Sequence, residues 1–92
     1  MNIDRLMDDL DRLDFQSEPY LIGLRLLILN AINVINRHRI ANPQPCSQLI
    51  RSLQATYRDI PSSSDDCDVH EFNLLKAQVY DSLGRFNNLA AA

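Results

Sequence analysis

A thiol and an imidazole lie three residues apart in the segment Cys67-Asp68-Val69-His70. At the start of a helix this spacing lets both side chains reach one metal ion, and Cys46 or His38 could complete a tetrahedral zinc site. A closed zinc site needs four ligands, however, and only this pair has the spacing of metal ligands. We therefore expect an acidic helix start with an incidental histidine, and no bound metal or other cofactor.

A nucleophilic thiol is the second chemical possibility at Cys67. The dipole of a helix lowers the pKa of a thiol in its first turn and favours the reactive thiolate. The neighbouring carboxylates of Asp66 and Asp68 oppose that negative charge. We therefore expect an unreactive thiol at this position.

The carboxylates of the chain could act as general acids or bases, but only in a pocket that shifts their pKa. The acidic residues considered for this role fall on outer faces of predicted helices or at a helix start: Asp8, Asp9, Asp11, Asp65, Asp66, Asp68 and Glu71. Solvation explains such positions, so we predict no enzymatic activity and no catalytic residues.

Two groups of polar residues could bind a macromolecule. Arg37-His38-Arg39 either neutralises the negative end of a helix or forms a basic patch for an acidic partner. If segment 45–59 is the second helix of a helix-turn-helix, its outer face carries residue types that read DNA bases: Ser47, Gln48, Arg51, Ser52, Gln54 and Arg58. Two prolines in the connection and a net charge of −3 disfavour nucleic acid, because phosphate binding needs an excess of Lys and Arg.

These side chains must be positioned by helices. Apolar residues recur three and four apart, which predicts one helical domain over residues 1–92 with helices at about 3–14, 18–41, 45–59 and 66–89. A hydrophobic fraction of 46% suits a globular protein, and two glycines are too few for the turns of an all-β chain. Short connections favour an all-α fold, an antiparallel four-helix bundle or a closely related small helical array.

The ends of the predicted helices follow from capping residues and prolines. Ser17-Glu18-Pro19 suits the start of the second helix, and Asn42-Pro43-Gln44-Pro45 ends it, because proline disfavours helix at the preceding residue. Ser64, Asp65 and Asp66 are predicted to cap the fourth helix. Gly84 is predicted to weaken it.

The second predicted helix is unusually apolar. Its apolar side chains cover more than half of the circumference, wider than the stripe of about 100° on an ordinary surface helix: Leu21, Leu24, Leu27, Ile28, Ala31, Ile32, Val34 and Ile35. The narrow polar strip consists of Gly23, Asn30, Asn33 and Arg37. The asparagines at 30, 33 and 36 either face solvent or fix the register of a helix–helix interface. Either three other helices surround this helix, or it also meets a second chain.

The fourth predicted helix carries a single apolar seam that includes Val79, Leu83 and Phe86. Because the second helix has more apolar surface than a one-sided helix needs, we predict a non-enzymatic protein–protein interaction module: a small regulator, inhibitor, adaptor or chaperone. Its partner is another protein, a second copy of the chain, or both. The predicted contact residues are Leu24, Ile28, Asn30, Asn33, Arg37, Val79, Leu83 and Phe86.

The sequence also bears on location. The N-terminal residues show neither the basic nor the apolar region of a signal peptide, and two cysteines suit a reducing compartment, so we expect a cytoplasmic protein. Segment 20–35 is shorter than the roughly 20 apolar residues that a bilayer requires, and Arg25, Asn30 and Asn33 interrupt it. We therefore expect no membrane span.

The layout of the middle of the chain carries one family resemblance. A long helix ends at Asn42-Pro43-Gln44-Pro45 and is followed by Gln48-Leu49-Ile50-Arg51-Ser52-Leu53 and Tyr57. Over residues 17–59 this resembles the bacteriocin-immunity proteins of lactic acid bacteria, of the enterocin A type. The resemblance implies a small cytosolic antiparallel four-helix bundle that protects the producing cell at the membrane-borne bacteriocin receptor complex.

Overall fold

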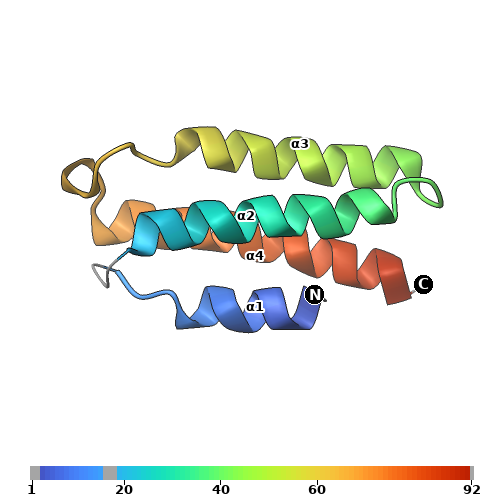
Figure 1. The fold of residues 1–92 in the computed structure, drawn as a ribbon, viewed down its shortest axis with the longest axis horizontal. Helices are drawn as coiled ribbons and strands as arrows, with labels where there is room; N and C mark the ends of the chain where they lie inside the picture. The colour runs from blue at the N-terminus through green and yellow to red at the C-terminus, as the bar shows by residue number, and fades with distance from the viewer. Residues whose placement is uncertain (1–2, 16–18, 92) are drawn as a thin grey trace.

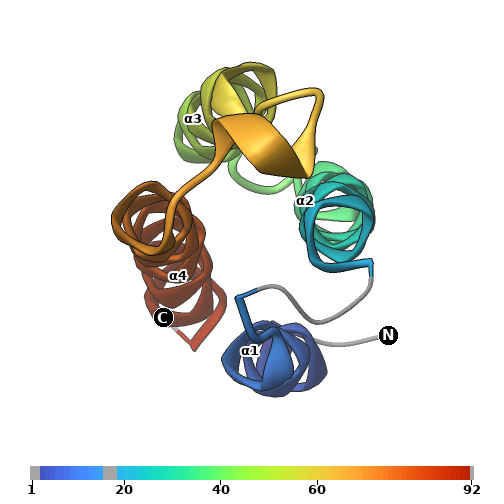
Figure 2. The same ribbon diagram turned by 90° about the vertical axis from the view of Figure 1, so that its left-hand side faces the viewer.

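Four α-helices and one short 3-10 turn make up the secondary structure of the computed structural model, which describes residues 3–15 and 19–91. They are α1 (Ile3–Arg12), α2 (Tyr20–Arg37), α3 (Pro43–Asp59), η1 (Ser64–Asp66) and α4 (Val69–Ala91). The helices run alternately up and down the 41 Å long axis (Figure 1). Viewed along that axis, they occupy the corners of a square in chain order (Figure 2). The predicted all-α four-helix bundle is thereby confirmed.

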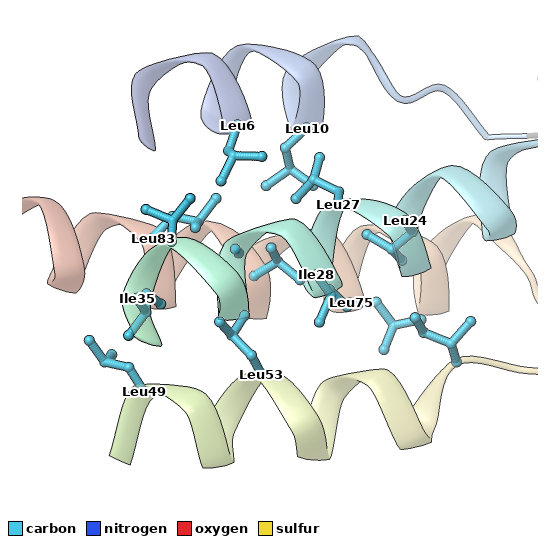
Figure 3. Packing of buried hydrophobic residues seen from close by; sticks show 14 of the residues in the cluster. Leu6, Leu10, Leu24, Leu27, Ile28, Ile35, Leu49, Leu53, Leu75 and Leu83 are labelled. Carbon is cyan, nitrogen blue, oxygen red and sulfur yellow. The ribbon is translucent and has the colours of Figure 1, made fainter. Parts of the chain in front are cut away.

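The core lies along the centre of this square and receives side chains from all four helices (Figure 3). Residues on α1, α2, α3 and α4 fall below 2% exposure, among them Leu6, Leu10, Leu24, Ile28, Ile35, Leu53, Phe72 and Leu83. Their spacing of three and four residues within each helix is what brings them onto one buried face. Most of the predicted apolar arc of α2 is therefore used inside the bundle.

The connection between α2 and α3 differs from the prediction. α2 ends at Arg37 rather than near residue 41, and α3 begins at Pro43 rather than at 45. Asn42 occupies the N-cap position, and its carbonyl accepts the N–H of Cys46 at 3.1 Å. Pro43 stands at the first helical position, where the missing N–H of proline costs no hydrogen bond. The proline-rich segment therefore starts α3, and a separate turn at 38–42 ends α2.

The start of α4 also differs from the prediction. Ser64, Asp65 and Asp66 form η1 instead of capping α4. Asp68 caps the helix, because its Oδ1 accepts a 2.7 Å hydrogen bond from the backbone N–H of Glu71. α4 therefore begins at Val69 and continues to Ala91, beyond the predicted end at 89.

The first two helices also have bounds that differ from the predicted ones. α1 ends at Arg12, two residues earlier than predicted, and the N–H of Leu13 donates to the Leu10 carbonyl at 3.2 Å. α2 begins at Tyr20, one residue after Pro19. The predicted start at residue 18, with Ser17 and Glu18, lies outside the described residues.

Two long-range hydrogen bonds fasten the connections to the helices. On α2, Arg25 donates from Nη2 to the carbonyl oxygen of Pro61 at 2.6 Å, which holds the connection between α3 and α4. On α4, Lys76 donates from Nζ to the carbonyl oxygen of Leu13 at 2.8 Å, which holds the end of α1. Both bonds join segments that are far apart in the chain.

An aromatic cluster closes the end of the bundle where α2 and α4 begin. The rings of Phe15, Tyr20 and Phe72 lie with their centroids 5.1 to 6.0 Å apart, in tilted or edge-to-face arrangements. Lys76 Nζ lies 5.6 Å from the centroid of the Phe72 ring. The cluster joins the α1–α2 connection to the first turn of α4.

Candidate protein-interaction surface

The structure divides the predicted contact residues between the core and the surface. The side chains of Leu24, Ile28, Val79 and Leu83 are 0% exposed and that of Phe86 is 3% exposed. Figure 3 shows Leu24, Ile28 and Leu83 directed into the bundle. These five side chains therefore hold the helices together and cannot contact a partner while the bundle is folded.

The remaining predicted contact residues lie on the surface of α2. Asn30, Asn33 and Arg37 are all exposed. Their amides and guanidinium face solvent, as the simpler of the two interpretations of the polar strip predicted. The structure thus brings the three polar residues to one accessible side and separates them from the five apolar ones.

A line of exposed apolar side chains runs along the outer face of α2. Ile22, Leu26 and Leu29 are 54%, 56% and 44% exposed. They are spaced four and then three residues apart, and Asn33 follows four residues later, so the four side chains share one face of the helix. We call Ile22, Leu26, Leu29 and Asn33 the outer stripe.

The sequence interpretation did not include the apolar members of the outer stripe among the contact residues. Apolar residues surround most of α2, and such a pattern does not show which of them the other helices will cover. A usable signal was present, because Ile22, Leu26 and Leu29 lie on the opposite side of the helical wheel from Leu24 and Ile28. Once Leu24 and Ile28 are assigned to the core, the residues on the opposite side of the helix must face outward.

The outer stripe borders a shallow groove between α1 and α2. Leu26 and Asn30 line one side of it, and Asp9 and Leu13 line the other, around a volume of about 270 Å³. At the C-terminal end of α2, Arg37 and Arg39 are exposed, and Ile40 in the following turn is 96% exposed. The surface therefore combines an apolar centre, amide groups and cations at one end, which suits contact with another protein.

The two cysteines lie at opposite ends of the bundle, Cys46 in the first turn of α3 and Cys67 just before α4 (Figure 1). Both are buried. Burial raises the pKa of the Cys67 thiol; the carboxylates of Glu71 and Asp68 raise it further, and a hydrogen bond with Tyr20 opposes them. A thiol kept protonated in this way is a poor nucleophile.

The Cys67–His70 pair is not completed into a metal site by the residues that the structure describes. Among them, no group of three or more His, Cys, Asp and Glu side chains gathers around one point. Cys67 is buried whereas His70 is exposed, so the two side chains occupy different environments.

A polar groove of about 360 Å³ runs between α3 and α4, lined by Ser52, Ala55, Thr56, Asp59, Gln78, Asp81, Ser82 and Arg85. In it, Thr56 Oγ1 lies within hydrogen-bond distance of the Ser52 carbonyl, at 3.1 Å, and of Gln78 Oε1, at 3.0 Å. The buried hydroxyl of Thr56 is thus satisfied by its own helix and by α4. These contacts join α3 to α4.

The residues considered for DNA reading lie on a helix pair that does not have the geometry of a helix-turn-helix. Gln48, Arg51 and Gln54 are exposed on α3. However, α2 and α3 lie side by side and antiparallel (Figures 1 and 2). In a helix-turn-helix the two helices cross at about 90–120°.

Within the described residues, α2 is the one helix long and apolar enough to cross a membrane by length and composition. In the bundle, 44% of it is buried by the other helices. Core helices of soluble proteins meet the same criteria, so this is weak evidence for a span.

No protein-family model, curated protein or solved structure matches the chain.

Proposed function

We propose that the protein is a non-enzymatic protein–protein interaction module that binds its partner through the outer stripe of α2. The observation that carries this proposal is the adjacent placement of Ile22, Leu26 and Leu29, each about half exposed, on one face of a helix whose opposite face is buried. Contiguous exposed apolar side chains rimmed by polar groups are typical of partner-binding surfaces. The flanking Asn30 and Arg37 supply such a rim.

The placement of these residues favours binding over a role in stability. The core is filled without them, since Leu24, Ile28 and Ile35 of the same helix are 0% exposed. Half-exposed leucines contribute little to folding but contribute apolar area when a partner covers them. A regulator, inhibitor, adaptor or chaperone would use the surface in this way.

A cytoplasmic location is part of the proposal. Cys46 and Cys67 are both unpaired and stand at opposite ends of the bundle, which suits a reducing compartment.

The test compares three baits in a pull-down from the native host. They are the wild-type chain, the pair variant Leu26→Gln with Leu29→Gln, and the control Leu74→Gln, which replaces a leucine 53% exposed on α4. Circular dichroism establishes that all three baits are folded. We expect wild type and the Leu74 control to retain the same proteins, and the pair variant to lose them. Retention of the same set by all three baits would contradict the proposal.

A second candidate is bacteriocin immunity, which the resemblance of residues 17–59 implies. The observation that favours it is the antiparallel packing of α2 and α3 across the short turn at 38–42, within the segment that carries the resemblance. The test is to express the chain in the cytosol of bacteriocin-sensitive cells and measure survival over a series of bacteriocin concentrations. Unchanged killing of the expressing cells would remove this candidate.

A further inference from the structure

Charges of opposite sign gather at the two ends of the bundle. Arg37 and Arg39 are exposed at the end where α2 passes into α3. The opposite end, where α3 passes into α4, exposes a series of carboxylates: Asp59, Asp65, Asp66 and Asp68. These carboxylates outnumber the exposed cations at this end, Arg12 and Arg58. Arg25 and Lys76 also lie at this end, but they are half-buried and donate to the carbonyls of Pro61 and Leu13. The molecule is therefore polarised along its long axis.

The outer stripe lies between these two ends. α2 begins at the acidic end and reaches Arg37 after 18 residues, which is about 27 Å of helix. The stripe is apolar from Ile22 to Leu29 and becomes polar at Asn33. Because Arg25 holds the α3–α4 connection through Pro61, that connection is fixed at the end of the bundle where α2 begins, and η1 lies at the same end.

We propose that the partner of this surface is a second copy of the chain, packed with the two α2 helices antiparallel and a two-fold axis near Leu26. The proposal rests on the proposed function and names its partner. In this arrangement Ile22 of each copy meets Leu29 of the other, and Leu26 meets itself. A two-fold interface uses the same patch on both copies, which a stripe centred on one leucine permits.

The charges select the antiparallel orientation. When the two α2 helices run in opposite directions, Arg37 and Arg39 of each copy face the acidic end of the other. When they run in the same direction, like charges meet at both ends. Complementary charge at the edge of an interface mainly fixes orientation and association rate, and salt screens it.

The size of the surface sets the expected affinity of the dimer. Three half-exposed apolar side chains from one helix provide less than the roughly 800 Å² per partner of a stable interface. We therefore expect a monomer–dimer equilibrium with a dissociation constant in the micromolar to millimolar range, which shifts toward monomer at high salt.

Sedimentation equilibrium over a wide range of protein concentration measures the association. We expect the wild type and Leu74→Gln to dimerise with the same constant, and Leu26→Gln with Leu29→Gln to remain monomeric. Reversal of the basic end, Arg37→Glu with Arg39→Glu, should weaken dimerisation at least about tenfold. Adding Asp65→Lys and Asp66→Lys to the same chain should recover at least half of that loss on a logarithmic scale.

Cysteine cross-linking tests the orientation. Leu26 and Arg37 are 11 residues apart, about 16 Å along the helix, whereas disulfide formation needs Cβ atoms roughly 4 Å apart. In the antiparallel dimer Leu26→Cys cross-links to its copy and Arg37→Cys does not. In a parallel dimer both would cross-link. The wild-type chain, with Cys46 and Cys67 buried, gives the background.

The outcomes separate the two proposals. A wild type that stays monomeric at millimolar concentration, together with a pull-down that the stripe variant still abolishes, overturns self-association and leaves the interaction surface standing. A dimer that survives Leu26→Gln with Leu29→Gln overturns self-association through the outer stripe. Cross-linking at Arg37 equal to that at Leu26 overturns the antiparallel orientation.

Discussion

Arg25 on α2 donates a 2.6 Å hydrogen bond from Nη2 to the carbonyl oxygen of Pro61, which is 36 residues further along the chain. The bond ties the connection between α3 and α4 to the side of α2. Because Pro61 has no backbone N–H, its carbonyl is the one main-chain group through which it can be held by hydrogen bonding. A cation on α2 thus holds the connection beside the buried side chain of Ile60.

Replacing Arg25 with Met should remove this bond and keep most of the aliphatic packing. Hydrogen bonds to charged groups contribute about 1.5–3 kcal/mol when buried, and this one is only partly buried. We therefore expect the free energy of unfolding to fall by about 1 kcal/mol, measured by urea denaturation. Arg51→Met is the control, since Arg51 is exposed on α3. Equal losses in both variants would show that the bond to Pro61 contributes nothing.

Asp68 caps α4, and its removal should weaken that helix. Asp68→Ala leaves the N–H of Glu71 without its 2.7 Å partner and should lower the free energy of unfolding by about 1 kcal/mol. Asp66→Ala, in η1, should change it by less than about 0.5 kcal/mol. Thermal unfolding followed by circular dichroism measures both. A larger loss for Asp66→Ala than for Asp68→Ala would contradict Asp68 as the cap and favour the cap predicted from the sequence.

The two glycines stand in helices but have different surroundings. A Cβ added at Gly84 meets nothing within 4 Å, whereas one added at Gly23 would lie 2.9 Å from Leu13 Cδ2. Gly84→Ala should therefore raise the free energy of unfolding by about 1 kcal/mol, the difference in helix propensity. Gly23→Ala should raise the free energy of unfolding by less, because the Leu13 side chain must move to admit the added Cβ. Urea denaturation of both variants is the measurement, and an equal gain at the two positions would contradict the close approach of Leu13.

The Cys67 thiol should make stability depend on pH in the alkaline range. Its pKa is raised above the ordinary value of 9.0 in the folded protein, so the unfolded chain loses the proton first. The associated stability is complete below the pKa of the unfolded chain and is lost as pH rises through the folded pKa. We expect the difference in unfolding free energy between wild type and Cys67→Ala to shrink from about pH 8 to about pH 10. A difference that stays constant across this range would contradict the raised pKa.

The helices were predictable from the sequence because their core positions repeat at the period of a helix. Leu6 and Leu10 on α1, or Val79 and Leu83 on α4, fall on one face by spacing alone, and the structure buries them. Helix ends were less predictable. Pro43 can terminate one helix or begin the next, and only the turn at 38–42 decides between these roles.

The candidate surface was predictable only in part, for a related reason. Spacing identified α2 as a helix with apolar residues on more than one side. It also placed Asn30 and Asn33 on the polar strip of that helix. Which apolar ladder faces outward depends on where the other helices pack. Leu24 and Leu26 are the same residue type on opposite sides of the helical wheel, and the packing of the other helices leaves Leu24 0% exposed and Leu26 56% exposed.

The shortness of α1 has a consequence for how the bundle opens. With 10 residues it is about 15 Å long, against about 35 Å for the 23 residues of α4. So short a helix has little stability of its own and depends on Leu6 and Leu10 remaining docked. Its amides should therefore exchange hydrogen with solvent through a local opening that leaves α2, α3 and α4 assembled, and each such opening bares the side of α2 next to Leu26.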